Sequence, residues 1–294
     1  MEQFVVTTLR GATPIIIAAL AGLFSVRAGI FHMGIEGLML AGAFTAVAAG
    51  TATGSLWAGL LAAVGVNLLL SWLYWLLIDR YQADSIIAGL GLTTLCVGGT
   101  AFFMFTIFGR QGSMASSVRL PTPVSGPQTG LLAYVSELSI MVWLLPFIIG
   151  GCWLLLRRSR LGLHIAAVGQ YPYGAEAAGV DISRTKLYAC LLTGVGCALA
   201  GAQLSIGDIA NFTENMTTGR GFIALAAILF GASHPLWTAV AGLFFGLADA
   251  IGIVSQLNAN SVVPRQFILM IPFITTILAV TVSSFIIRRR RGIP

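Results

Sequence analysis

Residues 55–78 read Ser-Leu-Trp-Ala-Gly-Leu-Leu-Ala-Ala-Val-Gly-Val-Asn-Leu-Leu-Leu-Ser-Trp-Leu-Tyr-Trp-Leu-Leu-Ile, a run without one charged side chain. An α-helix needs about 20 mostly apolar residues to cross the hydrocarbon core of a bilayer. The run therefore predicts a transmembrane helix, and similar runs predict about nine crossings in all, with eight or ten equally compatible. The other predicted crossings lie near 8–26, 29–50, 86–108, 135–156, 187–207, 217–233, 236–255 and 266–287.

The composition of the whole chain agrees with a membrane protein. Hydrophobic residues make up 57% of the 294 residues and charged residues only 9%, whereas soluble domains are roughly a quarter charged. The fold class we expect is all-α, a polytopic membrane helical bundle forming one transmembrane domain over residues 1–294. The net charge of +6 comes mainly from short segments between apolar runs, so it indicates orienting loops and no nucleic-acid partner.

The basic residues also predict the orientation, because Lys and Arg are retained on the cytoplasmic side. Five of them lie at the two ends of the loop over about residues 158–186, and four more end the chain, so both segments are expected inside. They are Arg157, Arg158, Arg160, Arg184 and Lys186, followed by Arg288, Arg289, Arg290 and Arg291. Residues 109–134, with three prolines, then form an external loop, and nine crossings place the N-terminus outside.

Two segments of the chain look alike. Gly37-Leu-Met-Leu-Ala-Gly-Ala resembles Gly221-Phe-Ile-Ala-Leu-Ala-Ala, and the Leu-Trp pairs that follow Ser55 and Pro235 continue the match. In the predicted topology the two copies cross the membrane in opposite directions, which is the inverted repeat of transporters with broken helices and a solute path between the repeats. The match is short, so coincidence in a Leu-, Ala- and Gly-rich sequence stays open.

Three polar residues at membrane depth are candidates for the solute path. Glu36 lies in an apolar segment, where a carboxylate is expensive and is a candidate for function by default. Gly34 and Gly37 flank it, so Glu36 either accompanies a structural break of the helix or lines the path. Asn67 and Asp249 either line the path as well or hydrogen-bond a neighbouring helix.

The usual catalytic and metal-binding patterns are missing from the sequence. The four cysteines lie in apolar stretches without ligand spacing, and the three histidines are far apart along the predicted topology. They are Cys96, Cys152, Cys190 and Cys197, with His32, His164 and His234. No GxxxxGK[ST], GxSxG or HExxH motif occurs, so we expect no metal, no bound cofactor and no ATPase site in this chain.

The segment Arg160-Leu-Gly-Leu-His-Ile-Ala-Ala-Val-Gly-Gln-Tyr-Pro-Tyr-Gly-Ala-Glu-Ala-Ala-Gly-Val-Asp-Ile-Ser-Arg-Thr-Lys is the most informative stretch. It resembles the cytoplasmic coupling loop of the ABC import permeases that handle branched-chain amino acids, ribose-type sugars and nucleosides. The residues that fit the loop pattern are Gly162, Ala167, Val168, Gly169, Pro172, Ala175, Gly179 and Val180. Gly34-Ile-Glu-Gly37 and residues 218–231 are similar to two further family segments, so the resemblance covers most of the chain.

The resemblance implies a bacterial inner-membrane permease, closest to the simple sugar and nucleoside permeases that are paired with basic membrane lipoprotein-type binding proteins. It implies three partners: ATP-binding subunits that hold ATP and magnesium, a second permease subunit, and an external solute-binding protein. Membrane lipid surrounds the chain, which is not itself an enzyme. The residues that the resemblance assigns to ATPase coupling are Gly162, Val168, Gly169, Pro172, Ala175, Glu176 and Gly179. The loop's polarity and Pro172 separately predict a short helix over 172–178 that a partner's groove could hold.

Three departures from the family pattern leave the solute open: Tyr171 replaces an Asn, His32 stands where an Asn commonly precedes the G-x-E-G, and residues 231–235 replace a more basic turn. The main alternative is an ion-coupled secondary transporter, in which Glu36 and Asp249 are the coupling carboxylates. A third interpretation, an intramembrane enzyme, is not supported, because the sequence has no paired nucleophile and base at membrane depth.

Overall fold

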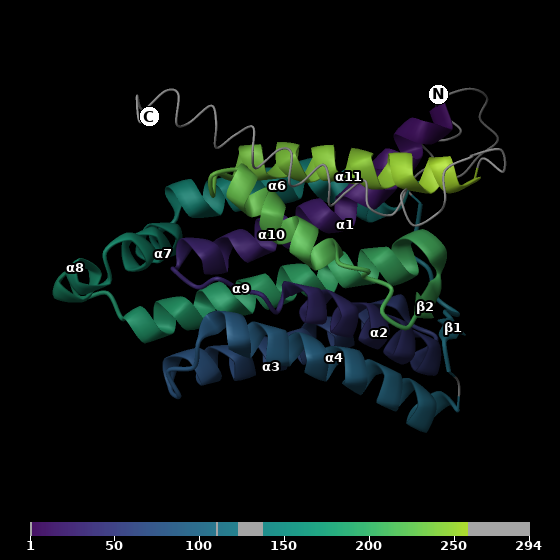
Figure 1. The fold of residues 1–294 in the computed structure, drawn as a ribbon, viewed down its shortest axis with the longest axis horizontal. Coiled ribbons are helices and arrows are strands. Elements are labelled where there is room, and N and C mark those ends of the chain that lie inside the picture. The colour runs from purple at the N-terminus through teal and green to yellow at the C-terminus, as the bar shows by residue number, and fades with distance from the viewer. Residues whose placement is uncertain (1, 110, 123–137, 258–294) are drawn as a thin grey trace, which may run out of the picture.

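The computed structural model describes residues 2–109, 111–122 and 138–257. These residues form a helical bundle with one short two-stranded sheet (Figure 1). The elements are α1 (Glu2–Arg27), α2 (Ile35–Thr53), α3 (Leu56–Asp79), α4 (Ser85–Phe108), β1 (Ser113–Ala115), α6 (Ile140–Arg158), α7 (Arg160–Gln170), α8 (Pro172–Ala177), α9 (Ile182–Ala202), the π-helix η1 (Gln203–Ile209), β2 (Asn211–Thr213), α10 (Arg220–Phe230) and α11 (Pro235–Leu257).

Seven helices of the described residues are long and apolar enough to cross a membrane, which confirms the all-α polytopic bundle. They are α1, α2, α3, α4, α6, the continuous α9–η1 segment and α11. The crossing predicted near 266–287 lies outside the described residues.

The crossing predicted near 217–233 is wrong. Residues 220–230 form α10, whose 11 residues span about 16 Å at 1.5 Å per residue, about half of the hydrocarbon core. Gly219, with φ 87°, precedes the helix, and Ala232 and Ser233, with φ 47° and 56°, follow it. An apolar window does not detect such left-handed turns, because the residues between them are as apolar as in a full crossing.

The predicted crossing near 29–50 also begins later than expected. The chain leaves α1 at Arg27, passes Gly29 at φ 82° and regains a helix at Ile35. We call residues 28–34 the inner linker and residues 210–219, which join η1 to α10, the outer linker. Both linkers return the chain into the bundle before a new helix starts (Figure 1).

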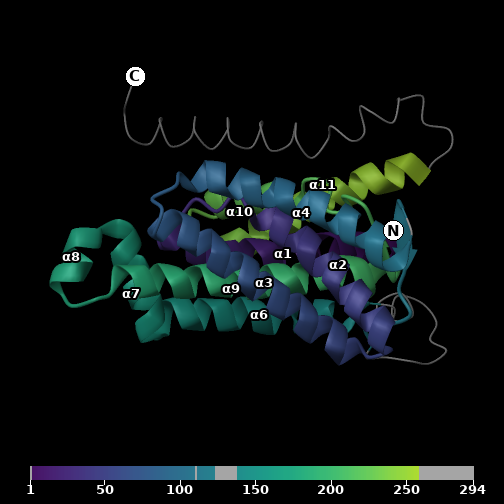
Figure 2. The ribbon, with the colours of Figure 1, turned by 90° about the horizontal axis from the view of Figure 1, so that it is seen from below.

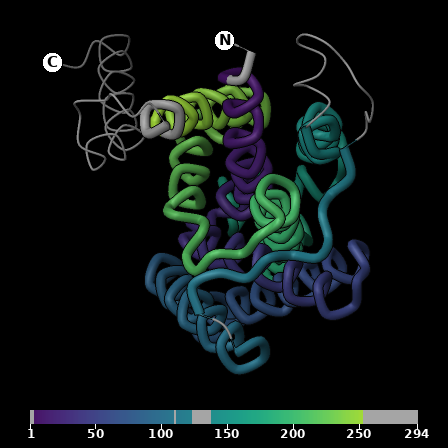
Figure 3. The backbone as a smooth tube through the Cα atoms, turned by 90° about the vertical axis from the view of Figure 1, so that its right-hand side faces the viewer, coloured from purple at the N-terminus to yellow at the C-terminus, as the bar shows by residue number. Residues whose placement is uncertain are grey.

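Helices α1, α2 and α9 form the centre of the bundle, and α3, α4, α6 and α11 surround them (Figures 1 and 3). The central helices can approach closely because small residues face one another. Added side-chain atoms at Gly42 and Gly201 would overlap the backbones of Ala198 and Met39. The outer helices α3 and α4 leave most of their apolar residues exposed, as expected for surfaces that face lipid.

The arrangement of the helices agrees with the predicted inverted repeat. α1, α2 and α3 correspond in order to α9–η1, α10 and α11, and α1 packs along α11 as α9 packs along α3. α1 and the α9–η1 segment are each followed by a linker that turns into the bundle. The helices that come next, α2 and α10, run in opposite directions (Figure 1). The two repeats therefore meet where the short linkers end.

The two ends of the bundle carry different structures. α7 and α8 project at one end, and β1 and β2 lie at the other end with the start of α1 (Figures 1 and 2). That the end with α7 and α8 faces the cytoplasm stays a prediction from the basic residues of this region. β1 pairs antiparallel with β2, with Ser113 opposite Thr213. The Leu120 N–H also donates to the Ile206 carbonyl of η1 over 3.0 Å. The described part of the predicted external loop is thus bonded to η1 and the outer linker.

Candidate functional site

Glu36 lies where the two repeats meet. It is in the first turn of α2 and is 4% exposed. Its Oε1 accepts a hydrogen bond from the Gly219 backbone N–H over 2.8 Å, and its Oε2 accepts one from the Gly221 N–H over 2.6 Å. The carboxylate therefore caps the N-terminus of α10, a helix from the other repeat.

These contacts explain how a charge is tolerated inside an apolar bundle. The N-termini of α2 and α10 both carry partial positive charge, which favours an anion between them. Hydrogen bonds to a charged group contribute about 1.5–3 kcal/mol each, and both carboxylate oxygens have one. The structure contains a helix break next to Glu36, but it is the inner linker, residues 28–34, which ends at Gly34, and Gly37 lies inside the continuous helix α2. A role of Glu36 in lining the path stays a prediction.

The capped terminus lies well inside the bundle. A Cβ on Gly37 would lie 2.7 Å from the Cα of Thr93 in α4, and Thr93 is about 12 Å along that helix from Ser85 at 1.5 Å per residue. A Cβ on Gly221 would lie 2.5 Å from the Cα of Glu36. Glycine at position 221 therefore lets the start of α10 come within hydrogen-bonding distance of Glu36, and glycine at position 37 lets α2 approach the backbone of α4.

Asp249 forms an ion pair between α10 and α11. Its Oδ2 accepts from Arg220 Nη2 at 2.9 Å and from Nε at 3.2 Å, and the two side chains are only 16% and 20% exposed. The sequence analysis did not single out Arg220. The internal repeat could have identified Arg220, because aligning Gly37 with Gly221 puts Arg220 at the position that corresponds to Glu36. The structure thus joins Glu36 and Asp249 through the first turn of α10.

Asn67 belongs to a different contact. It is fully buried in α3, and its Nδ2 donates to the Ala63 carbonyl over 3.0 Å. A Cβ on Gly42 of α2 would lie 3.0 Å from that Nδ2, and one on Gly194 of α9 would lie 2.9 Å from the Asn67 carbonyl oxygen. Asn67 therefore lies in the packing of three helices and is not brought together with the Glu36 site.

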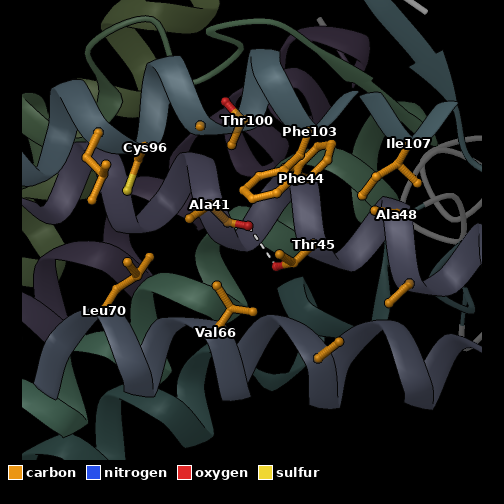
Figure 4. Close-up of a pocket in the computed structure, with 14 residues that line it drawn as sticks. Ala41, Phe44, Thr45, Ala48, Val66, Leu70, Cys96, Thr100, Phe103 and Ile107 are labelled. Atoms are coloured by element: carbon orange, nitrogen blue, oxygen red, sulfur yellow. Dashed lines mark hydrogen bonds between the residues drawn. The ribbon is translucent and has the colours of Figure 1, made fainter. Parts of the chain in front are cut away.

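An apolar groove of about 450 Å³ runs between α2, α3 and α4 (Figure 4). It extends along α4 from Leu95, two residues beyond Thr93, to Ile107. Its walls combine small side chains with two aromatic rings, those of the buried Phe44 and of Phe103, which is 51% exposed. The lining residues are Ala41, Phe44, Thr45, Ala48, Ala49, Ala62, Val66, Leu70, Leu95, Cys96, Gly99, Thr100, Phe103 and Ile107. Sequence reasoning missed this groove because its residues are of the types that also face lipid.

The predicted coupling loop contains two short helices. α7 is capped by Ser159, whose Oγ accepts from the Gly162 N–H over 3.0 Å. α8 has Pro172 at its first position, where proline favours a helix start. It ends before Gly179 at φ 82°. The expected short helix over 172–178 is therefore present.

At Gly169 the loop contacts the end of α1 and the start of the inner linker. Gly169, at the end of α7, lies against the carbonyl of Arg27 and 3.5 Å from the position of a Cβ on Gly29. A side chain on Gly169 would overlap the Arg27 carbonyl. The backbone of the loop therefore touches the segment that leads to Glu36.

Some of the other predicted coupling residues are buried and others are exposed to solvent. Val168 and Ala175 are buried, whereas Glu176 is exposed. Two aromatic residues of the loop that were not among the predicted coupling residues, Tyr171 and Tyr173, are 69% and 81% exposed. Exposed aromatic rings on a short projecting helix are typical of a protein-binding surface.

The bundle, its inverted repeat and its capped half-helix at membrane depth define a multi-pass membrane transport protein. The chain belongs to the family described as branched-chain amino acid transport system / permease component, whose model matches residues 4–280. It is a permease subunit of an ATP-binding cassette importer, a multi-pass protein of the bacterial inner membrane. The resemblance stated from the sequence is thereby confirmed.

Several named relatives match most of the chain. The guanosine ABC transporter permease protein NupQ of Bacillus subtilis is 33% identical over 96% of this chain and 92% of its own. The nucleoside ABC transporter permease protein NupC of Lactococcus lactis is 28% identical over 95% and 91%. The putative glucose ABC transporter permease protein TsgC13 of Haloferax volcanii is 32% identical over 85% and 76%. No solved structure matches the chain significantly.

Proposed function

We propose that this permease imports a nucleoside, received from an external binding protein and driven by ATP-binding subunits that bind to α7 and α8. The nucleoside assignment is supported by the names of the relatives NupQ and NupC. TsgC13 is named as a putative glucose permease, so a simple sugar is the alternative solute to compare in uptake measurements. The observation that carries the mechanism is the contact of Gly169 with the inner linker.

The ATP-binding partner would take α8 in a groove. The helix projects from the bundle (Figure 1), and its Tyr173 and Glu176 are exposed. A short helix with an aromatic anchor suits helix-in-groove recognition. ATP and magnesium would be held by that partner, and this chain would contribute the coupling surface.

The apolar groove would form one wall of the solute path. It runs along α4 to the level at which the two repeats meet, and Phe44 and Phe103 offer it aromatic surfaces. Stacking of a base on an aromatic side chain is worth about 1–3 kcal/mol, so the groove suits a nucleobase better than a sugar. A second permease subunit would complete the wall on the open side.

The external binding protein would dock at the opposite end, on the paired segment of β1 and β2. This segment is bonded to η1 and continues into the outer linker. Each end of the molecule is then connected by a linker to the contact between Glu36 and α10. Binding of ATP and of the loaded binding protein would shift the balance between outward and inward states through these two linkers.

Uptake measurements with a Phe103→Ala variant test the path. In membrane vesicles containing the whole importer, we expect the concentration of guanosine at half-maximal uptake to rise about tenfold, because one stacking contact is lost. Phe105→Ala is the matched control, since this residue is 56% exposed on the same helix but does not line the groove. Equal effects of the two variants, or the same loss of glucose uptake in Phe103→Ala, would contradict the proposed path.

A further inference from the structure

A second cavity, of about 290 Å³, lies at the cytoplasmic end of the bundle where α1, α6 and α11 meet. Arg27 is the last residue of α1, Arg157 is in the last turn of α6, and His234 directly precedes α11. The residues that line the cavity are Arg27, Trp153, Leu156, Arg157, His234 and Pro235. The proposed transport mechanism uses none of the charged groups of this cavity.

The described residues that line the cavity supply positive charge and no carboxylate. Arg27 donates from Nε to the Ser233 carbonyl over 2.8 Å, and its other guanidinium nitrogens have no partner among the described residues. The Arg157 guanidinium carbon lies 5.5 Å from the centre of the Trp153 ring, and within the described ranges no carboxylate forms an ion pair with either arginine. Two like charges in one cavity favour an anionic ligand.

A third polar group of the cavity has no partner among the residues that the structure describes. The Nδ1 atom of His234 is buried and makes no hydrogen bond to any of them. A buried polar atom without a partner is costly and calls for an explanation such as a ligand. Leu156 and Pro235 add apolar surface beside these groups, so the cavity offers both cationic and apolar contacts.

We infer that this cavity binds the phosphate of an anionic phospholipid from the cytoplasmic leaflet. Arginine forks match phosphate oxygens, and basic pockets between transmembrane helices on the cytoplasmic side are suited to anionic head groups. Trp153 lies five residues before the end of α6, and aromatic side chains are enriched near the ends of transmembrane helices, where the head groups lie. The Arg27 carbonyl touches Gly169, so a lipid bound to the Arg27 guanidinium holds the end of α1 against the coupling loop.

Thermal unfolding of the purified full chain in detergent tests this site with short-chain phosphatidylglycerol as the probe. Phosphatidylglycerol is expected to raise the melting temperature, whereas phosphatidylcholine does not. The apparent affinity should fall about tenfold in Arg157→Gln and in Arg27→Gln, since each loses a charged hydrogen bond. Arg157 is exposed, so its variant should fold even if Arg27→Gln does not.

Arg158→Gln is the control, because Arg158 is the exposed neighbour of Arg157 and does not line the cavity. Equal weakening in this control would overturn the proposal in favour of unspecific surface charge. Inorganic phosphate at the same concentration should give no shift, and a full shift would overturn the lipid source and indicate a site for soluble phosphate. Since these outcomes are measured without transport, they are independent of the proposed solute.

Discussion

Glu36 is a charged residue whose partners are backbone groups of a distant segment. Both of its oxygens accept N–H donors from α10, so the charge stabilises a helix terminus inside the bundle. Replacing Glu36 by Gln would leave one oxygen acceptor and turn an amide NH₂ toward the other backbone donor.

We therefore predict that Glu36→Gln lowers the stability of the chain by about 2 kcal/mol, measured as a lower melting temperature in detergent, and that it lowers uptake in parallel. Glu214→Gln is the control, because among the described residues only its Oε1 accepts a hydrogen bond, from the Gly112 N–H at 2.9 Å, and Gln keeps that acceptor. An unchanged melting temperature with abolished uptake would instead place the carboxylate in the solute path.

At the scale of single residues, the sequence predicted that Glu36 has a structural or functional role, because a carboxylate among apolar residues needs compensating contacts. Its partners could not be predicted, since amide groups at Gly219 and Gly221 give no side-chain signal. Asp249 was selected on the same ground, but its partner Arg220 was visible only through the repeat. For Asn67, the sequence left packing and path lining equally open, and burial between three helices supports packing.

Gly169 is the point at which one element touches another without side chains between them. The loop helix α7 meets the end of α1 there, next to the linker that leads into α2. Any side chain at this position must push the two backbones apart.

Gly169→Ala is accordingly predicted to separate α7 from the inner linker at a cost of about 1–3 kcal/mol, and to reduce uptake about tenfold while the chain still inserts in the membrane. Gly150→Ala in α6 serves as the control, because a Cβ there meets no atom within 4 Å. Uptake that is equal in the two variants would remove Gly169 from the coupling path.

The elements themselves were mostly predictable, because a crossing of about 20 apolar residues is a strong signal. The short helix α8 was also predicted, from Pro172 and the polarity of its loop. The failure at 217–233 has a physical reason: the ends of α10 are set by backbone turns at Gly219 and Ser233, and hydropathy carries no information about them.

In the proposed mechanism, the described bundle has two functional ends that are joined through its centre. α8 lies at one end and the β1–β2 pair at the other (Figures 1 and 2), and each end reaches the Glu36 contact through its own linker. The inverted repeat accounts for this arrangement, because the same helix–linker–helix unit occurs in both directions.

Cysteine labelling in intact cells tests the orientation. We predict that a membrane-impermeant maleimide labels Ser113→Cys in β1 and labels Tyr173→Cys in α8 only after the cells are opened, because the basic residues place α8 in the cytoplasm. The native cysteines Cys96, Cys152, Cys190 and Cys197 are buried and give little background. Labelling of Tyr173→Cys from outside would invert the orientation and with it the roles of the two ends.

Co-purification of the tagged chain from its native membrane tests the central claim most directly. We predict that an ATP-binding subunit accompanies the wild-type chain and the Glu214→Ala control, and that it is lost when residues 170–179 are substituted. A chain that purifies alone in all three cases, and still takes up solute in response to an ion gradient, would contradict the account and identify a secondary transporter.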